Sequence, residues 1–264
     1  MRTSIAPTQI NIWDDRFYSV SVNDVGKIPK HLEYLIDDGF IYLPSVTHIL
    51  DVSLDKGKQF QQWLQSVGSN ASTVATIAAQ KGSRVHKCCE MLLSGEEISY
   101  DSVIDTETTH IGQHMSMDEW KAVLKFKEFY EQANPTGAIS ESIVYNTEDG
   151  YAGSVDIICM ISDERWLIDI KYSNAVYDSH YLQLEAYSRC VGDIDRIGVL
   201  HLKAQTRGID KSGKKFQGRG WQLVEPKVDR ETLFNTWKAL LTIYKFKAGG
   251  ETPVSLTIPK TVKL

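Results

Sequence analysis

Three short β-forming runs, joined by tight turns, constrain the fold of this chain more than any other feature of its sequence. The runs cover residues 139–145, 152–161 and 166–171, with turn-forming residues at 148–150 and 162–164. Connections this short join antiparallel neighbours, whereas parallel strands need a crossover of a dozen or more residues. We therefore predict an antiparallel meander of three strands.

Helical periodicity lies on both sides of this meander. Gly68 divides the pattern between 56 and 95 into two helices, and Asp118 is predicted to cap a third helix that ends near Asn134. After the meander we predict a helix over 178–191, a strand over 196–202, a short strand over 221–224 and an amphipathic helix over 229–247. This order predicts an α/β fold in which helices flank a central mixed sheet.

Two N-terminal segments differ in character from this pattern. Residues 12–22 and 39–43 are typical of a small hairpin, and the stretch from Pro44 to Leu50 predicts a turn that opens a short helix. The stretch 88–120 carries eight acidic residues and no Lys or Arg. We therefore predict a solvated, mobile loop over 96–119.

Charge and cysteine content exclude several classes of protein. The 29 Lys and Arg residues against 34 Asp and Glu leave a net charge of −5, which argues against a surface uniformly coated with positive charge. No apolar run approaches the ~18 residues of a membrane span, and the N-terminus lacks a secretory signal, so we expect a cytoplasmic protein. The four cysteines, which form no C-x-x-C pair, are interpreted as reduced packing residues: Cys88, Cys89, Cys159 and Cys190.

The residues best suited to chemistry lie in the meander. Asp156 stands among apolar residues of the second strand, and Asp169 and Lys171 end the third. Alternation places Asp169 and Lys171 on one face of that strand and Ile170 on the other. Two carboxylates and an ammonium on neighbouring strands suit a hard divalent cation, with the lysine orienting or deprotonating a water. The alternative is a surface ion pair worth ~1 kcal/mol or less.

Other polar residues are placed to join this site. Glu141, at the start of the first strand of the meander, is expected to reach the same end of the sheet. Gln183 and Tyr187 are four residues apart and share a helix face that we expect to look onto the site. His86 lies one turn from Glu90 in the long helix. For Gln183, Tyr187 and His86, ordinary structural roles remain open alternatives.

The ordered set Gly82-x-x-x-His86, Glu141, Gly153-x-x-Asp156, Asp169-Ile170-Lys171 and Gln183-x-x-x-Tyr187 resembles RecB-family nucleases of the PD-(D/E)XK superfamily. The stretch 44–50, followed by the helix with His86, is most similar to the mitochondrial genome maintenance exonucleases and their phage relatives. The resemblance spans about residues 40–190. It implies a restriction-endonuclease-like core with an N-terminal helical elaboration, within a single nuclease domain over 1–264. We expect 1–135 to form the N-terminal hairpin and helical cover, and 136–264 the core with its C-terminal hairpin and helix.

The resemblance also implies a role for each matched residue. His86, Asp156, Asp169 and the carbonyl of Ile170 would bind Mg²⁺ or Mn²⁺, and Lys171 would be catalytic. Glu141 would be a ligand or an orienting group, and Gln183 and Tyr187 would support Lys171 and the DNA strand. Some relatives carry an iron–sulfur cluster on cysteines, but no cysteine follows Cys190, so no cluster is expected here. Lys171 is followed by Tyr172, where a small residue is more usual.

A basic stretch is the predicted DNA contact. Residues 203–219 carry a net charge of +5, from one aspartate and the cations Lys203, Arg207, Lys211, Lys214, Lys215 and Arg219. Such a cluster can bind phosphates, and Phe216 and Trp221 beside it can stack on bases. The alternative is a solvated β-turn loop anchored by the two aromatic residues.

Together these features predict an Mg²⁺- or Mn²⁺-dependent DNA exonuclease of replication, repair or recombination, in a bacterial or phage-infected cell. In the similar nucleases a helical arch over the sheet admits a single strand, and we expect 44–95 to supply those helices. Cleavage is therefore expected from single-stranded ends. The alternatives are a DNA endonuclease, and a non-catalytic DNA-binding or inhibitory module that keeps the fold.

Overall fold

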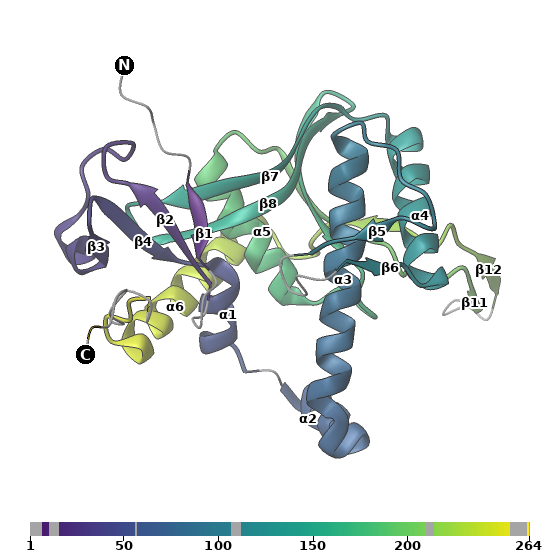
Figure 1. Ribbon diagram of the computed structural model, residues 1–264, viewed down its shortest axis with the longest axis horizontal. Coiled ribbons are helices and arrows are strands. Elements are labelled where there is room, and N and C mark those ends of the chain that lie inside the picture. Colours follow the sequence, from purple (N-terminus) through teal and green to yellow (C-terminus); the bar gives the residue numbers. More distant parts are fainter. Residues whose placement is uncertain are drawn as a thin grey trace.

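The computed structural model describes residues 7–10, 16–55, 57–106, 112–209, 214–253 and 263. Its centre is a five-stranded mixed sheet with the order β13-β10-β9-β8-β7, and Figure 1 labels the edge strand β7 and its neighbour β8. The strands are β7 (Thr136–Asn146), β8 (Tyr151–Ile161), β9 (Glu164–Lys171), β10 (Arg196–His201) and β13 (Gln222–Val224). The first three form the predicted antiparallel meander, while β10 runs parallel to β9 and antiparallel to β13.

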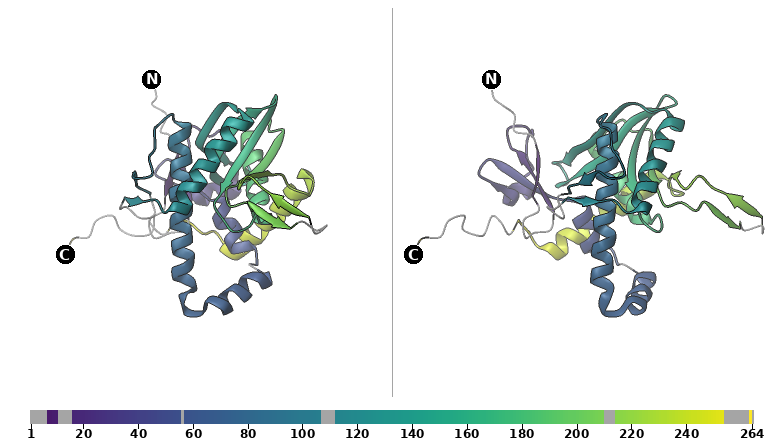
Figure 2. Two further views of the ribbon diagram at one scale, coloured as in Figure 1. Left: turned by 90° about the vertical axis from the view of Figure 1, so that its right-hand side faces the viewer. Right: turned by 45° about the vertical axis from the view of Figure 1, so that its right-hand side comes forward.

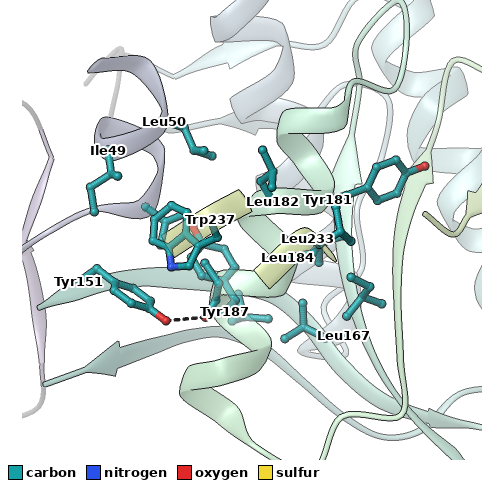
Figure 3. Packing of buried hydrophobic residues seen from close by; sticks show 14 of the residues in the cluster. Ile49, Leu50, Tyr151, Leu167, Tyr181, Leu182, Leu184, Tyr187, Leu233 and Trp237 are labelled. Carbon is teal, nitrogen blue, oxygen red and sulfur yellow. Dashed lines mark hydrogen bonds between the residues drawn. The ribbon is translucent and has the colours of Figure 1, made fainter. Parts of the chain in front are cut away.

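Three helices cover one face of this sheet. They are α1 (Val46–Ser53), α5 (Asp178–Val191) and α6 (Arg230–Ala248). Figure 3 shows their shared core, where Trp237 of α6 packs edge-on against Tyr151 of β8 with ring centroids 5.0 Å apart. The Tyr151 hydroxyl donates to the Ala186 carbonyl, which ties α5 to the same strand.

The long helix α3 (Ala71–Leu93) and α4 (Met117–Ala133) cover the other face. Val85 and Cys89 of α3 and Phe126 and Phe129 of α4 join a core that includes Ile170 of β9. The predicted arrangement, a central mixed sheet with helices on both faces, is therefore confirmed.

A second, smaller sheet lies before α1. Its order is β1-β2-β4-β3, with β1 (Thr8–Ile10), β2 (Phe17–Ser21), β3 (Ile36–Asp37) and β4 (Phe40–Pro44), and a 3-10 helix, η1 (Lys30–Leu35), precedes β3. The predicted hairpin partners β2 and β4 do pair antiparallel, although 12–15 lie outside the described residues. The short helix expected over 44–50 is α1, and Ser45 caps it, since its hydroxyl accepts from the His48 amide at 3.0 Å.

A helical arm extends away from the body of the molecule (Figures 1 and 2). It consists of α2 (Gly57–Val67), the short 3-10 turn η2 (Gly68–Asn70) and the N-terminal half of α3. The predicted break at Gly68 is confirmed: its φ of +62° is a left-handed conformation that glycine adopts without the cost of a Cβ clash.

The acidic stretch corrects two predictions. Residues 96–119 are not simply a solvated loop, because Ile104 and Met115 are buried with Cys88 of α3 and Val123 of α4, beside the short pair β5 (Val103–Ile104) and β6 (Gln113–His114). Ser116, rather than Asp118, caps α4. Its hydroxyl accepts from the Glu119 amide at 3.4 Å while the Glu119 carboxylate accepts from the Ser116 amide at 2.8 Å, a reciprocal capping box.

The basic stretch forms a hairpin of β11 (Arg207–Ile209) and β12 (Lys215–Gln217), which projects from the body in Figure 2. The cysteines are dispersed among the cores: Cys88, Cys89 and Cys159 are buried and Cys190 is partly buried. Burial raises the pKa of each of their thiols, which suits packing residues. Among the described helices, none combines the length and apolarity that a membrane crossing requires.

Candidate active site

The candidate site lies where β8 and β9 separate. Their pairing runs from Ile161 and Glu164 to Ile157 and Ile168 and stops one residue before Asp156 and Asp169. The Asp156 carboxylate accepts from the Ile170 amide at 2.6 Å and so takes the place of a backbone partner. Because the strands diverge there, two aspartates from neighbouring strands face a common space.

Asp169 and Lys171 share one face of β9, as alternation predicts. Lys171 Nζ lies 2.8 Å from Asp169 Oδ1, and both side chains are largely buried. Ile170 points into the opposite core, against α3 and α4. Asp169 is only 3% exposed, and its second oxygen, Oδ2, is buried with no hydrogen-bond partner among the described residues. This pair is therefore no surface ion pair.

His86 reaches the site from α3. Its Nδ1 lies 3.4 Å from Asp156 Oδ2, so the structure brings together two residues that are 70 positions apart. Burial lowers the pKa of His86 and nearby Lys171 lowers it further, which favours the neutral imidazole that can act as a ligand.

Burial also governs the charges on β8 and β9. It raises the pKa of Asp156, and it raises that of Asp169 to about 6 although Lys171 acts in the opposite direction. Burial by itself lowers the pKa of Lys171, but Asp169 and Asp156 outweigh it and the net shift is upward. The site therefore holds a charged ammonium beside carboxylates that are costly to ionise.

Glu141 lies in the middle of β7 rather than near its start, because β7 begins at Thr136. Its φ of +49° is a strained conformation for a residue with a Cβ, and Ser154 Oγ of β8 donates to its carboxylate at 3.1 Å. Glu141 is exposed, but partial desolvation of its carboxylate and the charge of Asp156 raise its pKa. Glu141 is thus close enough to Asp156 to join the acidic group.

Gln183 and Tyr187 are joined on α5, where Gln183 Nε2 donates to Tyr187 Oη at 3.2 Å. Tyr187 is buried, and burial raises the pKa of its phenol well above the ordinary value. A Cβ built on Gly153 would lie 2.2 Å from Tyr187 Cε1. Gly153 therefore lets this tyrosine pack directly on β8, a role for which spacing alone offered no signal.

The donor set suits a hard divalent cation. Carboxylate and carbonyl oxygens are the ligands that Mg²⁺ and Mn²⁺ prefer, and Asp169 Oδ2 is a buried carboxylate oxygen with no protein partner in the described chain. Across the described ranges, no three His, Cys, Asp or Glu side chains are already gathered into a metal-binding group. Lys171 Nζ instead donates a hydrogen bond to Asp169 Oδ1. The residues fit the ion by type and burial.

The basic stretch meets α4 at the base of its hairpin. An open pocket of about 700 Å³ is lined there by Lys125, Glu128, Thr206, Arg207, Gln217, Gly218 and Arg219. Lys125 of α4, which no sequence motif indicated, pairs with Glu128 at 2.6 Å, and Arg219 donates to Gln132 at 2.5 Å. The three cations against one carboxylate make this an anion-attracting pocket.

The structure describes only some of the remaining cations predicted to contact DNA. Lys203 Nζ lies 4.1 Å from the ring centroid of Tyr172, the residue after Lys171. The bulky Tyr172 is thereby accommodated, since it packs on the α3–α4 core and supports a cation near the site. Lys214 and the backbone of Lys215 are described, whereas Lys211 and the side chain of Lys215 lie outside the described part. Trp221 packs edge-on against Phe129, as its anchoring alternative predicts.

In comparisons with known proteins, no protein-family model matches the chain, and no curated protein matches its sequence.

Proposed function

We propose that this chain is a metal-dependent DNA exonuclease with a restriction-endonuclease-like PD-(D/E)XK core, acting from single-stranded ends. The observation that carries the proposal is the convergence of His86, Asp156, Asp169 and Lys171 at the separation of β8 and β9, with the unpaired Asp169 Oδ2 facing inward among buried groups. A surface ion pair would be exposed to solvent and would leave no buried carboxylate oxygen without a hydrogen-bond partner.

The proposed ligands are His86, Asp156, Asp169 and the Ile170 carbonyl. When bound, Mg²⁺ or Mn²⁺ supplies stabilisation of the charge on the attacking and leaving oxygens of a phosphodiester. Asp156 has a second duty in the chain, because its acceptance of the Ile170 amide fixes the backbone that presents this carbonyl.

Lys171 has the properties needed next to the scissile phosphate. Asp169 holds its Nζ at 2.8 Å, and the acidic surroundings keep the ammonium charged, so it can orient a water and neutralise phosphate charge. Gln183 and Tyr187 hold the adjacent face of α5 against β8. Glu141, beside Asp156, is suited to orient a water or a ligand.

The substrate assignment rests on charge and on the helical arm. Arg207, Arg219 and Lys125 line an open pocket in a protein of net charge −5, and phosphate contacts are the sequence-independent part of DNA binding. The arm of α2 and α3 extends beyond the sheet on the side that supplies His86. A strand that passes between this arm and the sheet would enter by its end, which a closed circle lacks.

The decisive experiment compares linear and covalently closed single-stranded DNA of one sequence. With Mg²⁺ or Mn²⁺, we expect the linear strand to be degraded to short oligonucleotides while the circle survives. Duplex with blunt ends should be cut more slowly, because separating each base-pair step costs ~1.4 kcal/mol. Lys171→Ala should lose nearly all cleavage yet keep much of its DNA affinity, since binding is spread over many phosphates.

Circles cut as fast as linear strands would establish an endonuclease. Cleavage of neither substrate, with retained binding, would favour the non-catalytic DNA-binding or inhibitory module. Near-normal turnover by Lys171→Ala would remove the catalytic role of that lysine.

A further inference from the structure

Two residues at the start of α5 form an aromatic pair that the proposed mechanism does not use. Tyr177, just before the helix, is 50% exposed, and its ring meets that of His180 edge-on, with centroids 5.5 Å apart and an interplanar angle of 82°. About half of the surface of Tyr177 is therefore open to solvent, and a tyrosine ring offers a flat apolar face with a polar edge to a ligand.

The tautomer of His180 is set by its hydrogen bond. The backbone amide of Tyr177 donates to His180 Nδ1 at 3.3 Å, so Nδ1 is the acceptor and Nε2 carries the hydrogen. Burial lowers the pKa of His180 to about 3, helped by Lys171 and His201. His180 is therefore a neutral imidazole with its Nε2–H available as a donor.

The pair lies beside the candidate active site. His180 is three residues before Gln183 and so shares its face of α5, the face whose Tyr187 packs on Gly153 of β8. His201, whose charge contributes to the lowered pKa of His180, is paired in register with Lys171 across β10 and β9. His180 is therefore within electrostatic range of the proposed catalytic lysine, and it holds the exposed Tyr177 ring on this side of the site.

We infer that Tyr177 and His180 form a contact for the nucleotide next to the scissile bond, with the Tyr177 ring stacked on its base and His180 Nε2 donating to a phosphate oxygen. This inference rests on the proposed function, because it places the pair on the DNA strand held at Lys171. A stacking ring accepts any base, so the contact supports binding without sequence preference.

The stacking half is tested by strand binding in a chelator, where cleavage is absent. A short oligothymidylate and an abasic strand of equal length are compared by fluorescence anisotropy. Tyr177→Leu should weaken oligothymidylate binding by roughly tenfold and leave abasic binding nearly unchanged, whereas Tyr177→Phe should keep the wild-type values. Tyr34→Leu, at an equally exposed tyrosine in η1, is the matched control and should change neither.

The phosphate half is tested at His180. His180→Leu should weaken binding of both strands by roughly tenfold, the loss expected for a hydrogen bond to a charged group, and His180→Gln, which keeps a donor near the Nε2 position, should restore most of it. Equal loss in both variants, with an unchanged melting temperature, would overturn the donor role.

Failure of the inference and failure of the proposed function give different results. If the wild type degrades linear DNA with Mg²⁺ but Tyr177→Leu keeps its preference for oligothymidylate over the abasic strand, the stacking contact is overturned and the nuclease stands. If the wild type neither binds nor cuts DNA, both are overturned.

Discussion

Gly153 and Tyr187 are the residues whose contact links β8 to α5 at the site. The backbone of β8 lies so close to the tyrosine ring that a Cβ on Gly153 would fall 2.2 Å from Cε1 and 2.7 Å from Oη. Gly82, in the helix that carries His86, is the opposite case, since a Cβ there meets nothing within 4 Å. Substitution by alanine is therefore expected to change the stability of the protein differently at these two positions.

Gly153→Ala is expected to destabilise the protein by about 1–3 kcal/mol, because Tyr187 or β8 must shift to relieve the overlap. Gly82→Ala should instead stabilise it by about 0.5–1 kcal/mol, because alanine is the better helix former. Urea unfolding of the two variants measures both changes. Equal effects would contradict the close packing of Tyr187 on β8.

Asp169 predicts a pH dependence of stability in the absence of metal. Burial raises its pKa from 3.8 to about 6, so the folded state holds the proton more tightly than the unfolded chain. Its contribution to stability is therefore complete below about pH 4 and is lost as the pH rises through about 6. Asp169→Asn cannot ionise and escapes this loss.

Relative to the wild type, Asp169→Asn should gain about 2–3 kcal/mol of unfolding free energy between pH 4 and pH 7. The measurement is urea unfolding across this range in a chelator, with Asp24→Asn, at an exposed turn position, as the control that follows the wild type. A constant difference between Asp169→Asn and the wild type would show that the carboxyl ionises normally.

At the scale of elements, the β11–β12 hairpin and α4 jointly build the basic pocket. Arg207 comes from the first hairpin strand, Arg219 follows the second, and Lys125 belongs to the helix. If DNA phosphates lie there, each lost contact removes about 0.9 from the slope of log affinity against log salt for duplex and about 0.7 for a single strand.

Arg207→Glu should therefore weaken single-strand binding. It should also reduce the slope of log affinity against log salt by about 0.7 or more, the value for one phosphate contact. Lys227→Glu, an equal charge reversal at an exposed position before α6, should leave the slope unchanged. Anisotropy titrations from 50 to 300 mM salt compare the two. Identical slopes for both variants would indicate that the hairpin is a solvated loop with no phosphate contact at Arg207.

At the scale of the whole molecule, the site joins elements from both faces of the sheet. His86 comes from α3 on one face, Gln183 and Tyr187 come from α5 on the other, and the aspartates come from the sheet between them. An ion bound at the proposed site would link the layers and would bind only the folded state.

Saturating Mg²⁺ or Mn²⁺, at about 100 times the dissociation constant, should add ~2.7 kcal/mol, which corresponds to a rise in melting temperature of roughly 5–10 °C for a chain of this size. Asp156→Ala should remove most of this rise, whereas Asp24→Ala should retain it. Differential scanning calorimetry with and without metal makes the comparison. An undiminished rise in Asp156→Ala would place the ion elsewhere.

The sequence by itself determined the local elements and the chemistry-bearing residues. The meander, the break at Gly68, the short helix after Pro44 and the α5 bounds depend on residues only a few positions apart, which is why periodicity and turn chemistry predict them. The Ser116 cap was missed because Asp118 is an equally good local candidate, and only the reciprocal bonds with Glu119 distinguish them.

Tertiary structure alone decided how these parts meet. The separation of β8 and β9, the strained Glu141, the burial of Ile104 and Met115 and the approach of His86 to Asp156 all depend on packing between distant segments. Burial in turn moved the pKa of Asp169, because removing a carboxylate from water penalises its charge. Residue order names the members of such a site, but their distances and charges arise only when the layers of the whole chain close around them.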